Sequence, residues 1–275
     1  MKFYQEEDIK GFDLVQFEYI KTEQDQHIFK IILNRPEKRN AFTPAMAEEI
    51  TYALAYAHYS SDIRCVILSA EGSVFCAGAD LQAFHDPGAS MRNNSIPVAR
   101  EEVKLGDAFA QLLKPSIAIV HGPVLAGGFL MICGCTFVYS VPEATYSLPE
   151  VKRGIWPMQV MASLLPIVPA RKIMEMAITG RVYSAPEALD LGLVTHIYPS
   201  EHLTSEAEKL AAVICSNAPY AIRLGMDAFQ KMQLLPQNEQ QTFLKGQLSL
   251  LLKSDDAHEG TQAFKEKRNP VWKGK

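Results

Sequence analysis

Phe75-Cys76-Ala77-Gly78-Ala79-Asp80 is a turn of small residues, and the pair Gly127-Gly128 later in the chain is a second one. Small residues let the backbone approach closely, so each turn can direct an N–H group at the same point. Two such donors around one oxygen form an oxyanion hole, which stabilises negative charge on a carbonyl. A carboxylate follows at Glu150, in Leu148-Pro149-Glu150. The combination favours an enzyme that forms the enolate of a thioester.

The composition is that of a globular protein with ample material for a core. The 275 residues are 48% hydrophobic and 21% charged, and this length occurs for a single α/β unit. The formal net charge is −4. Because such a chain has no basic field, we expect no nucleic acid partner.

The five cysteines indicate reduced thiols, since their number is odd and no spaced pair of CxxC units occurs. Cys133-Gly134-Cys135 has a spacing compatible with metal binding, but no His/Cys cluster accompanies it nearby. We therefore expect buried free thiols, no metal site and a cytoplasmic location.

The N-terminal residues 1–20 contain several acids and lack the uninterrupted apolar core of a signal peptide. Residues 115–142 contain no Asp, Glu, Lys or Arg and are long enough to cross a bilayer. Three prolines and four glycines divide this stretch into short pieces. A buried strand–turn–helix–strand in a core explains it better than a membrane span, and we expect no membrane partner.

Strand and helix patterns alternate in the first half of the chain. A helix is expected to begin after Thr43, with Pro44 in its first turn, and to run to about Tyr59. Strands separated by helices favour crossover connections and mostly parallel pairing, hence an α/β fold. The β-branched and apolar runs predict strands at Phe29–Leu33, Cys65–Leu68, Ser116–Val120 and Thr136–Tyr139.

The pattern is almost entirely helical from Met158 onward. We divide the chain into a core domain, residues 1–200, and a helical oligomerisation region, residues 201–275. The segment from Asp86 to Val98 is rich in turn residues and predicts a mobile loop. Helices are expected to start at Pro169, Ser184 and Ser200, to cover Leu203–Ser216, Ala218–Met232 and Asn238–Lys253, and to follow Ser254.

Several motifs, taken together in their order along the chain, resemble those of the crotonase superfamily, the enoyl-CoA hydratase/isomerase family. Each motif is weak alone, but together they cover most of the chain, from about Phe29 to Arg268. They are Asn34-Arg35-Pro36-Glu37-Lys38-Arg39-Asn40-Ala41, Phe75 to Asp80, Lys114-Pro115-Ser116-Ile117-Ala118, His121-Gly122 through Gly127-Gly128, Leu148-Pro149-Glu150 with Gly154, Thr179-Gly180, Ala185-Pro186-Glu187-Ala188 and Gly192-Leu193-Val194.

The resemblance implies a crotonase-like spiral of ββα units, a helical C-terminal region, and trimers that often pair into hexamers. It implies that the N–H groups of Ala79 and Gly127 hold the thioester oxygen and that Glu150 is the acid/base. The same resemblance gives an acyl-CoA thioester as substrate, with fatty acid metabolism as the general setting. Coenzyme A then belongs to the substrate, and no separate cofactor is expected.

The residues implied in substrate binding come from several motifs. Coenzyme A carries phosphates, which cations hold. The resemblance implies that Phe264 and Lys267 of a neighbouring subunit contact its nucleotide end and that Lys38 lies near the same coenzyme A. A solvated surface charge is the alternative for each lysine. The implied substrate-binding set is Ala77, Ala79, Asp80, Leu81, Gly127, Lys38, Phe264 and Lys267.

One position departs from the family pattern. Hydratases of the family usually carry a second glutamate three residues after the oxyanion glycine, and here that residue is Leu130. Met158 stands where some dienoyl-CoA isomerases of the family keep a second acid. Asp80 is interpreted mainly as a residue that structures its own turn, and His121 as structural. A single carboxylate suits double-bond migration, so isomerisation is preferred and hydration is the close alternative.

Two further inferences concern the acyl group and the class of protein. Large apolar side chains at Trp156, Met158 and Met161 indicate an apolar acyl group. A non-catalytic acyl-CoA-binding protein is the alternative from another class. Glu150 argues against it, because binding alone has no need of a buried carboxylate.

Overall fold

The computed structural model describes residues 1–86 and 91–275. Within them, the main sheet has six strands in the order β1-β2-β3-β4-β6-β9. The β1–β2 pair is antiparallel, and the pairs from β2 to β9 are parallel, so the predicted parallel pairing is confirmed. The strands are β1 Ile20–Asp25, β2 Ile28–Leu33, β3 Cys65–Ala70, β4 Ser116–Val120, β6 Phe137–Ser140 and β9 His196–Ile197.

The fold also contains a smaller sheet and several short helices. The smaller sheet has the order β5-β7-β8 and combines a parallel and an antiparallel pair. Its strands are β5 Val124–Leu125, β7 Thr145–Ser147 and β8 Val182–Ser184. The short helices are η1 Glu6–Ile9, η2 Phe12–Leu14, η3 Pro36–Lys38, α2 Leu81–His85, α3 Leu105–Ala110, η5 Ala126–Gly128, α4 Phe129–Ile132, η6 Pro149–Arg153, α5 Met158–Leu164 and α7 Ala185–Asp190.

Two helices begin at side-chain caps that the sequence indicates. The Thr43 side chain accepts a hydrogen bond from the Met46 N–H at the start of α1, and Ser184 and Glu187 form a capping box at α7. Each cap satisfies backbone donors that the first turn of a helix leaves unpaired. The longer helices are α1 Pro44–Tyr59, α6 Ala170–Thr179, α8 Ser200–Ser216, α9 Pro219–Met232, α10 Gln237–Leu251 and α11 Asp255–Glu266.

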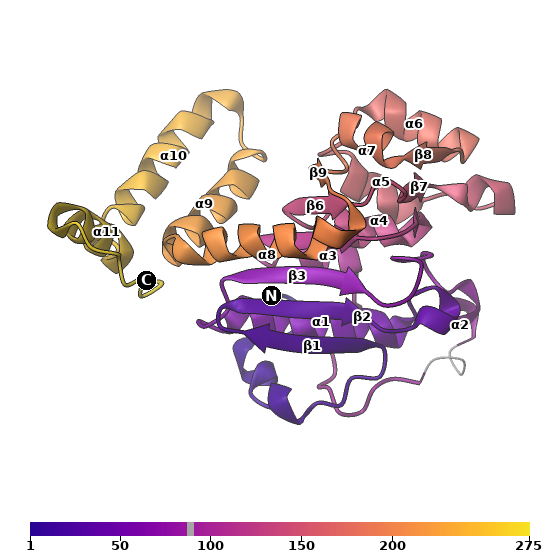
Figure 1. Cartoon of the computed structure of the whole chain (residues 1–275), viewed down its shortest axis with the longest axis horizontal. Helices are drawn as coiled ribbons and strands as arrows, with labels where there is room; N and C mark the ends of the chain where they lie inside the picture. The colour runs from indigo at the N-terminus through magenta and orange to yellow at the C-terminus, as the bar shows by residue number, and fades with distance from the viewer. Residues whose placement is uncertain (87–90) are drawn as a thin grey trace.

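Helix α8 packs along the main sheet, whereas the helices that follow it extend away (Figure 1). Leu203, Ala207, Ala211 and Ile214 of α8 are buried, at the spacing of one helix face. Within the described residues, α10 has no buried residue. Figure 1 shows α2 at one end of the molecule and α11 at the other.

The apolar stretch from residue 115 to 142 forms β4, β5, α4 and β6 in the centre of the core. Among the residues that the structure describes, none of the helices is long and apolar enough to cross a membrane. The five thiols are free, and burial raises the pKa of Cys133 and Cys135 to about 12. The loop predicted over residues 86–98 includes residues 87–90, which lie outside the described part of the chain.

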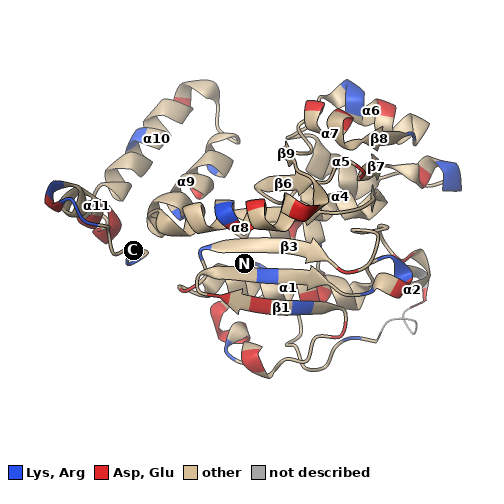
Figure 2. Ribbon diagram, viewed as in Figure 1, with Lys and Arg blue, Asp and Glu red and all other residues tan. Residues whose placement is uncertain are grey.

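Charges of both signs lie close together on the surface helices α6, α8 and α11 (Figure 2). Several of them form ion pairs, as Lys172 does with Glu175 at 2.9 Å and Lys209 with Glu206 at 2.6 Å. Exposed pairs of this kind contribute little to the free energy of folding, about 0–1 kcal/mol each. They distribute charge over these helices without forming a face of one sign.

Candidate functional site

The two small-residue turns meet at the carboxyl edge of the main sheet. One follows β3, and the other follows its neighbour β4. Cys76 pairs with Val124 in an isolated bridge, and the Leu125 N–H donates to the Cys76 carbonyl oxygen at 2.9 Å. Loops after neighbouring parallel strands commonly form the binding crevice of α/β proteins.

The backbone around Ala79 directs its N–H away from the neighbouring Phe42. The Phe42 N–H donates to the Gly78 carbonyl oxygen, and the Asp80 N–H donates to the Phe42 carbonyl oxygen, both at 2.9 Å. In an extended chain the polar groups of successive residues point to opposite sides, so those of Ala79 point to the side away from Phe42. The Ala79 N–H is thereby presented toward the second turn.

Gly127 supplies a second N–H beside that of Ala79. A Cβ placed on Gly78 would lie 3.1 Å from the Gly127 nitrogen, and a Cβ placed on Gly127 would lie 3.3 Å from the Ala79 nitrogen. Gly78 has a φ of 95°, and Ala126 has a φ of 49°, a conformation that is uncommon for a residue with a side chain. Such strained positions cluster at functional sites. The two amide nitrogens therefore flank one small space.

Glu150 lies in the short helix η6, where Pro149 occupies the first position. The residue is 7% exposed, and its Oε2 atom is buried without a hydrogen-bond partner. Burial raises the pKa of the Glu150 carboxyl, and a backbone hydrogen bond and the positive charge of Arg153 oppose this effect only in part. A carboxyl group whose pKa lies above its usual range is suited to exchanging protons near neutral pH.

The two turns and Glu150 line one cavity of about 630 Å³. Most of the described residues that line it are apolar, and Lys38, Arg39 and Arg153 are basic. The lining residues are Lys38, Arg39, Ala41, Phe42, Ala77, Ala79, Asp80, Leu81, Gln82, Leu125, Ala126, Gly127, Leu130, Pro149, Glu150, Arg153, Ile155, Trp156, Pro157, Met158, Gln159 and Val160.

Comparison with known proteins identifies the family. Residues 23–275 match the family model described as enoyl-CoA hydratase/isomerase. This chain belongs to that family. It is similar to the enoyl-CoA hydratase EchA19 of Mycobacterium tuberculosis, with 33% identity over 90% of this chain and 94% of the relative. It is also similar to the mevalonyl-coenzyme A hydratase sidH of Aspergillus fumigatus, with 32% identity over 90% and 92% of the two chains.

Solved structures confirm the predicted crotonase fold. An enoyl-CoA hydratase/isomerase from Mycobacterium paratuberculosis superposes with a TM-score of 0.83 and 28% identity, covering 94% of this chain and all of that chain. Human enoyl-CoA hydratase domain-containing protein 3 gives a TM-score of 0.81 and 27% identity, covering 93% of this chain and all of that one. The prediction of an enzyme of the crotonase superfamily is therefore confirmed.

The structure of this enoyl-CoA hydratase/isomerase family member brings most of the predicted site residues together. Phe264 and Lys267 do not line the cavity. Phe264 is 85% exposed on α11, and Lys267 caps the end of that helix. Figure 1 shows α11 at the opposite end of the molecule from α2, whose residues Leu81 and Gln82 line the cavity. The predicted residues that line it are Lys38, Ala77, Ala79, Asp80, Leu81, Gly127 and Glu150.

Asp80 is held by contacts in its own turn. Its carboxylate accepts a hydrogen bond from Arg35 at 2.8 Å and caps α2 through the Ala83 N–H. Burial alone would raise the pKa of Asp80, but the hydrogen bonds from Arg35 and Ala83 outweigh it and leave the pKa below its usual range. Sequence analysis did not single out Arg35 as this partner, although it belongs to a quoted motif.

The structure also places three other residues that the sequence analysis considered for the site. Leu130 is buried and forms part of the cavity wall, and the exposed Met158 also lines it. His121 lies outside this cavity, with its Nε2 atom 2.9 Å from the Gly72 carbonyl oxygen. Phe42 was not foreseen, and its only signal is its place directly after the Asn34–Ala41 motif.

Proposed function

We propose that the protein transforms acyl-CoA thioesters through an enolate, with the N–H groups of Ala79 and Gly127 as the oxyanion hole and Glu150 as the acid/base. The observation that carries this proposal is the arrangement of two neighbouring backbone donors and one buried carboxylate with an unpartnered oxygen around a single cavity. Trp156 and Met158 line the same cavity, which favours an apolar acyl group.

For a 3-enoyl-CoA, the Glu150 carboxylate would remove a proton from C2, the carbon next to the thioester. The electron pair moves onto the thioester oxygen, where the two N–H groups stabilise the negative charge. The protonated Glu150 then returns its proton to C4, and the double bond shifts to C2–C3. No water enters the reaction, and one carboxylate completes both proton transfers.

The acidic residues of the cavity favour isomerisation over hydration. Among the described residues that line the cavity, the carboxylates are Asp80 and Glu150. Asp80 is already paired with Arg35, and the apolar Leu130 occupies the position of the second glutamate. Addition of water is easiest with two carboxylates that orient the water and exchange its protons, whereas migration of a double bond needs one.

Hydration of a 2-enoyl-CoA is the second candidate. The names of the similar proteins EchA19 and sidH favour it, since both are called hydratases. In this case Glu150 would activate the water and also return the proton to C2. A non-catalytic acyl-CoA-binding protein is less well supported, because a buried carboxylate with an unpartnered oxygen costs free energy that binding alone does not recover.

The ratio of isomerisation to hydration tests the proposal. We expect the wild-type protein to convert a 3-enoyl-CoA to the 2-enoyl isomer faster than it hydrates the latter. Leu130→Glu should raise hydration, and Leu130→Gln is its uncharged control. Chromatography of both products from enoyl-CoA of several chain lengths measures the ratio. Efficient hydration without isomerisation would contradict the preference, and no turnover with bound CoA would favour the binding protein.

We further propose that the protein assembles as a trimer or a dimer of trimers. In one chain, Phe264 and Lys267 lie away from the cavity, so they would contact coenzyme A only from a neighbouring subunit. Large apolar side chains are exposed on α9, α10 and α11, among them Phe229, Leu248 and Leu250. Contact with another copy would cover part of this apolar surface.

Lys267→Ala should raise KM for the CoA thioester roughly fivefold with little change in kcat, on the scale of about 1 kcal/mol for an exposed ion pair. A phosphate contact remote from the reacting atoms is felt equally in ground and transition states. The effect should be larger at low salt. Lys265→Ala, on the same helix, is the matched control. Light scattering should give the same trimer or hexamer mass for all three proteins.

A lower kcat with unchanged KM would show that Lys267 has a different role. A monomer mass at micromolar concentration would instead contradict the assembly proposed here.

A further inference from the structure

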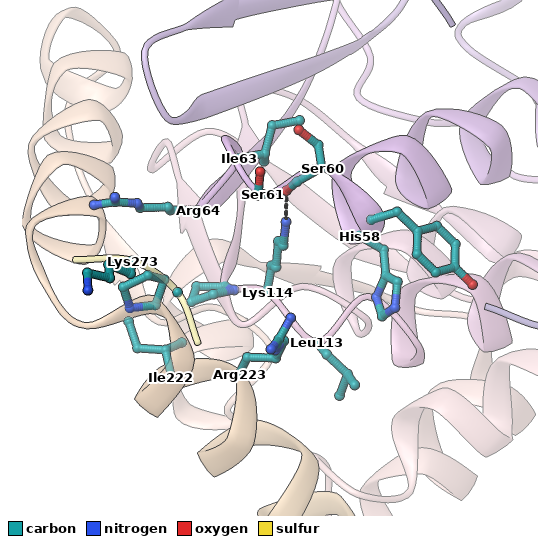
Figure 3. Close-up of a pocket in the computed structure, with 14 residues that line it drawn as sticks. His58, Ser60, Ser61, Ile63, Arg64, Leu113, Lys114, Ile222, Arg223 and Lys273 are labelled. Atoms are coloured by element: carbon teal, nitrogen blue, oxygen red, sulfur yellow. Dashed lines mark hydrogen bonds between the residues drawn. The ribbon is translucent and has the colours of Figure 1, made fainter. Parts of the chain in front are cut away.

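A second, smaller cavity of about 110 Å³ lies at the amino ends of β3 and β4, the opposite end of these strands from the thioester site. It is formed where α9 and the C-terminal tail meet the core. Basic side chains reach it from separate parts of the chain: Arg64 at the start of β3, Lys114 before β4, Arg223 of α9 and Lys273 of the tail (Figure 3). His58, near the end of α1, also lines it.

Two of the positive charges in this cavity, those of Lys114 and Arg223, have no direct ion pair within the described part of the chain. Within residues 1–86 and 91–275, neither Lys114 nor Arg223 has an ion pair with an acid, whereas Lys273 has Asp255 at 3.6 Å. The Lys114 ammonium donates to the Ser60 carbonyl oxygen at 2.5 Å. Since an ammonium has three donors, others remain for a ligand. Figure 3 shows the Arg223 side chain rising from α9 toward Lys114.

Two further features of the cavity wall are unexplained by the fold alone. The Nε atom of Arg64 is buried without a hydrogen-bond partner, although its Nη1 atom donates to the Cys215 carbonyl oxygen at 2.9 Å. A buried donor without a partner is uncommon and costs about 1–3 kcal/mol. Leu113, directly before Lys114, has a φ of 51°, which is uncommon for a residue with a side chain.

The electrostatics of Lys114 are compatible with anion binding. Burial, and then the charge of Arg223, lower the pKa of Lys114 to about 7, while Asp62 acts in the opposite direction. Burial also lowers the pKa of His58, and the charges of the N-terminus, Lys114 and Arg223 add to this effect. A bound anion would favour the charged form of each group.

We propose that this cavity binds a tetrahedral oxyanion of the size of sulfate or phosphate, held mainly by Lys114 and Arg223, with the positive charge of Arg64 in the cavity wall. Such a ligand would join α9 to the core, because its two main contacts come from these two parts of the chain. The small volume suits one oxyanion group better than a whole nucleotide. The site is separate from the thioester cavity and does not depend on the reaction proposed there.

Calorimetric titration with sodium sulfate at constant ionic strength, balanced with chloride, tests this site. We expect saturable binding to the wild-type protein, with Kd at least tenfold weaker in Arg223→Gln and Lys114→Met. The exposed Arg171→Gln and Lys245→Met are the matched controls and should bind as the wild type does. Arg223 is exposed, so its variant should fold even if that of Lys114 does not. Equal binding in wild type and Arg223→Gln, or no saturable binding, overturns the proposal.

The pH dependence of sulfate binding adds a second readout, since sulfate itself keeps its charge. Affinity should fall as pH rises above about 7, where Lys114 loses its proton. The other charged or titratable groups near it are His58, Tyr59, Asp62, Arg64, Arg223 and Lys273. The fall above pH 7 should disappear in Lys114→Met, and its persistence there would contradict the role of Lys114. Adenosine 3′,5′-bisphosphate distinguishes the source: tighter binding than sulfate, lost in Arg223→Gln, assigns the site to a phosphate ester.

Discussion

Glu150→Gln should lower turnover of the enoyl-CoA substrate about 10²–10⁴-fold, the usual contribution of general acid–base catalysis. Gln has nearly the same shape but cannot accept and return a proton. The N–H groups of Ala79 and Gly127 remain in place, so CoA-thioester binding should change little. Steady-state kinetics and a binding titration measure the two effects. Glu143→Gln, at an exposed acid outside the cavity, is the matched control, and full activity of Glu150→Gln would move the proton transfer to another residue.

The raised pKa of Glu150 gives this prediction a pH dependence. The carboxylate must be ionised to remove a proton, so kcat/KM should fall as pH decreases through the pKa of Glu150, above the usual range for Glu. The free energy of unfolding should change in the opposite sense. The folded protein holds this proton more tightly than the unfolded chain, so stability is lost as pH rises from the usual Glu pKa through the raised one. Glu150→Gln should remove that loss and be at least as stable at neutral pH.

The elements predicted from the sequence are those with strong local signals. Thr43-Pro44 and the Ser184/Glu187 capping box mark helix starts through contacts within one turn of the chain. Strand β1 was not predicted, because Ile20–Asp25 is mostly polar and only Ile20 is buried. Its strand conformation comes from antiparallel pairing with β2 along a sheet edge. Such pairing depends on a neighbour that a local pattern does not include.

The distinction between local sequence signals and contacts of distant segments also applies to the candidate site. The small-residue turns and Glu150 were predicted, because close backbone approach requires small residues and proton transfer requires an acid, and both residue types are visible in the sequence. The Arg35–Asp80 ion pair and the position of Phe42 were not, since they join segments about 40 residues apart in the sequence that meet only in the folded chain. The placement of Phe264 and Lys267 depends on how α9, α10 and α11 extend from the core, which local patterns do not specify.

Gly127→Ala should lower kcat about 10²–10³-fold, the range for loss of one oxyanion-hole donor. A Cβ at this position would lie 2.8 Å from the Phe42 Cε1 atom and 3.0 Å from its Cζ atom, so the ring or the backbone of the turn must shift. Phe42 is 5% exposed, and its ring meets that of Phe84 edge to face, so a shift of the ring would disturb this contact. The Gly127 backbone is therefore expected to move, and its N–H loses alignment with that of Ala79.

The double variant Gly127→Ala/Phe42→Leu tests whether the loss of kcat in Gly127→Ala comes from movement of the Gly127 backbone. Leu is shorter than Phe and removes the ring atoms that the new Cβ would meet, so the turn can keep its conformation and part of kcat should return. Phe42→Leu alone is the matched control for the cavity that the smaller side chain leaves. Because an oxyanion hole acts on the transition state, kcat should fall and recover while thioester binding changes little. If Gly127→Ala keeps the wild-type kcat, or if it loses binding and kcat together, the Gly127 N–H does not act on the developing enolate.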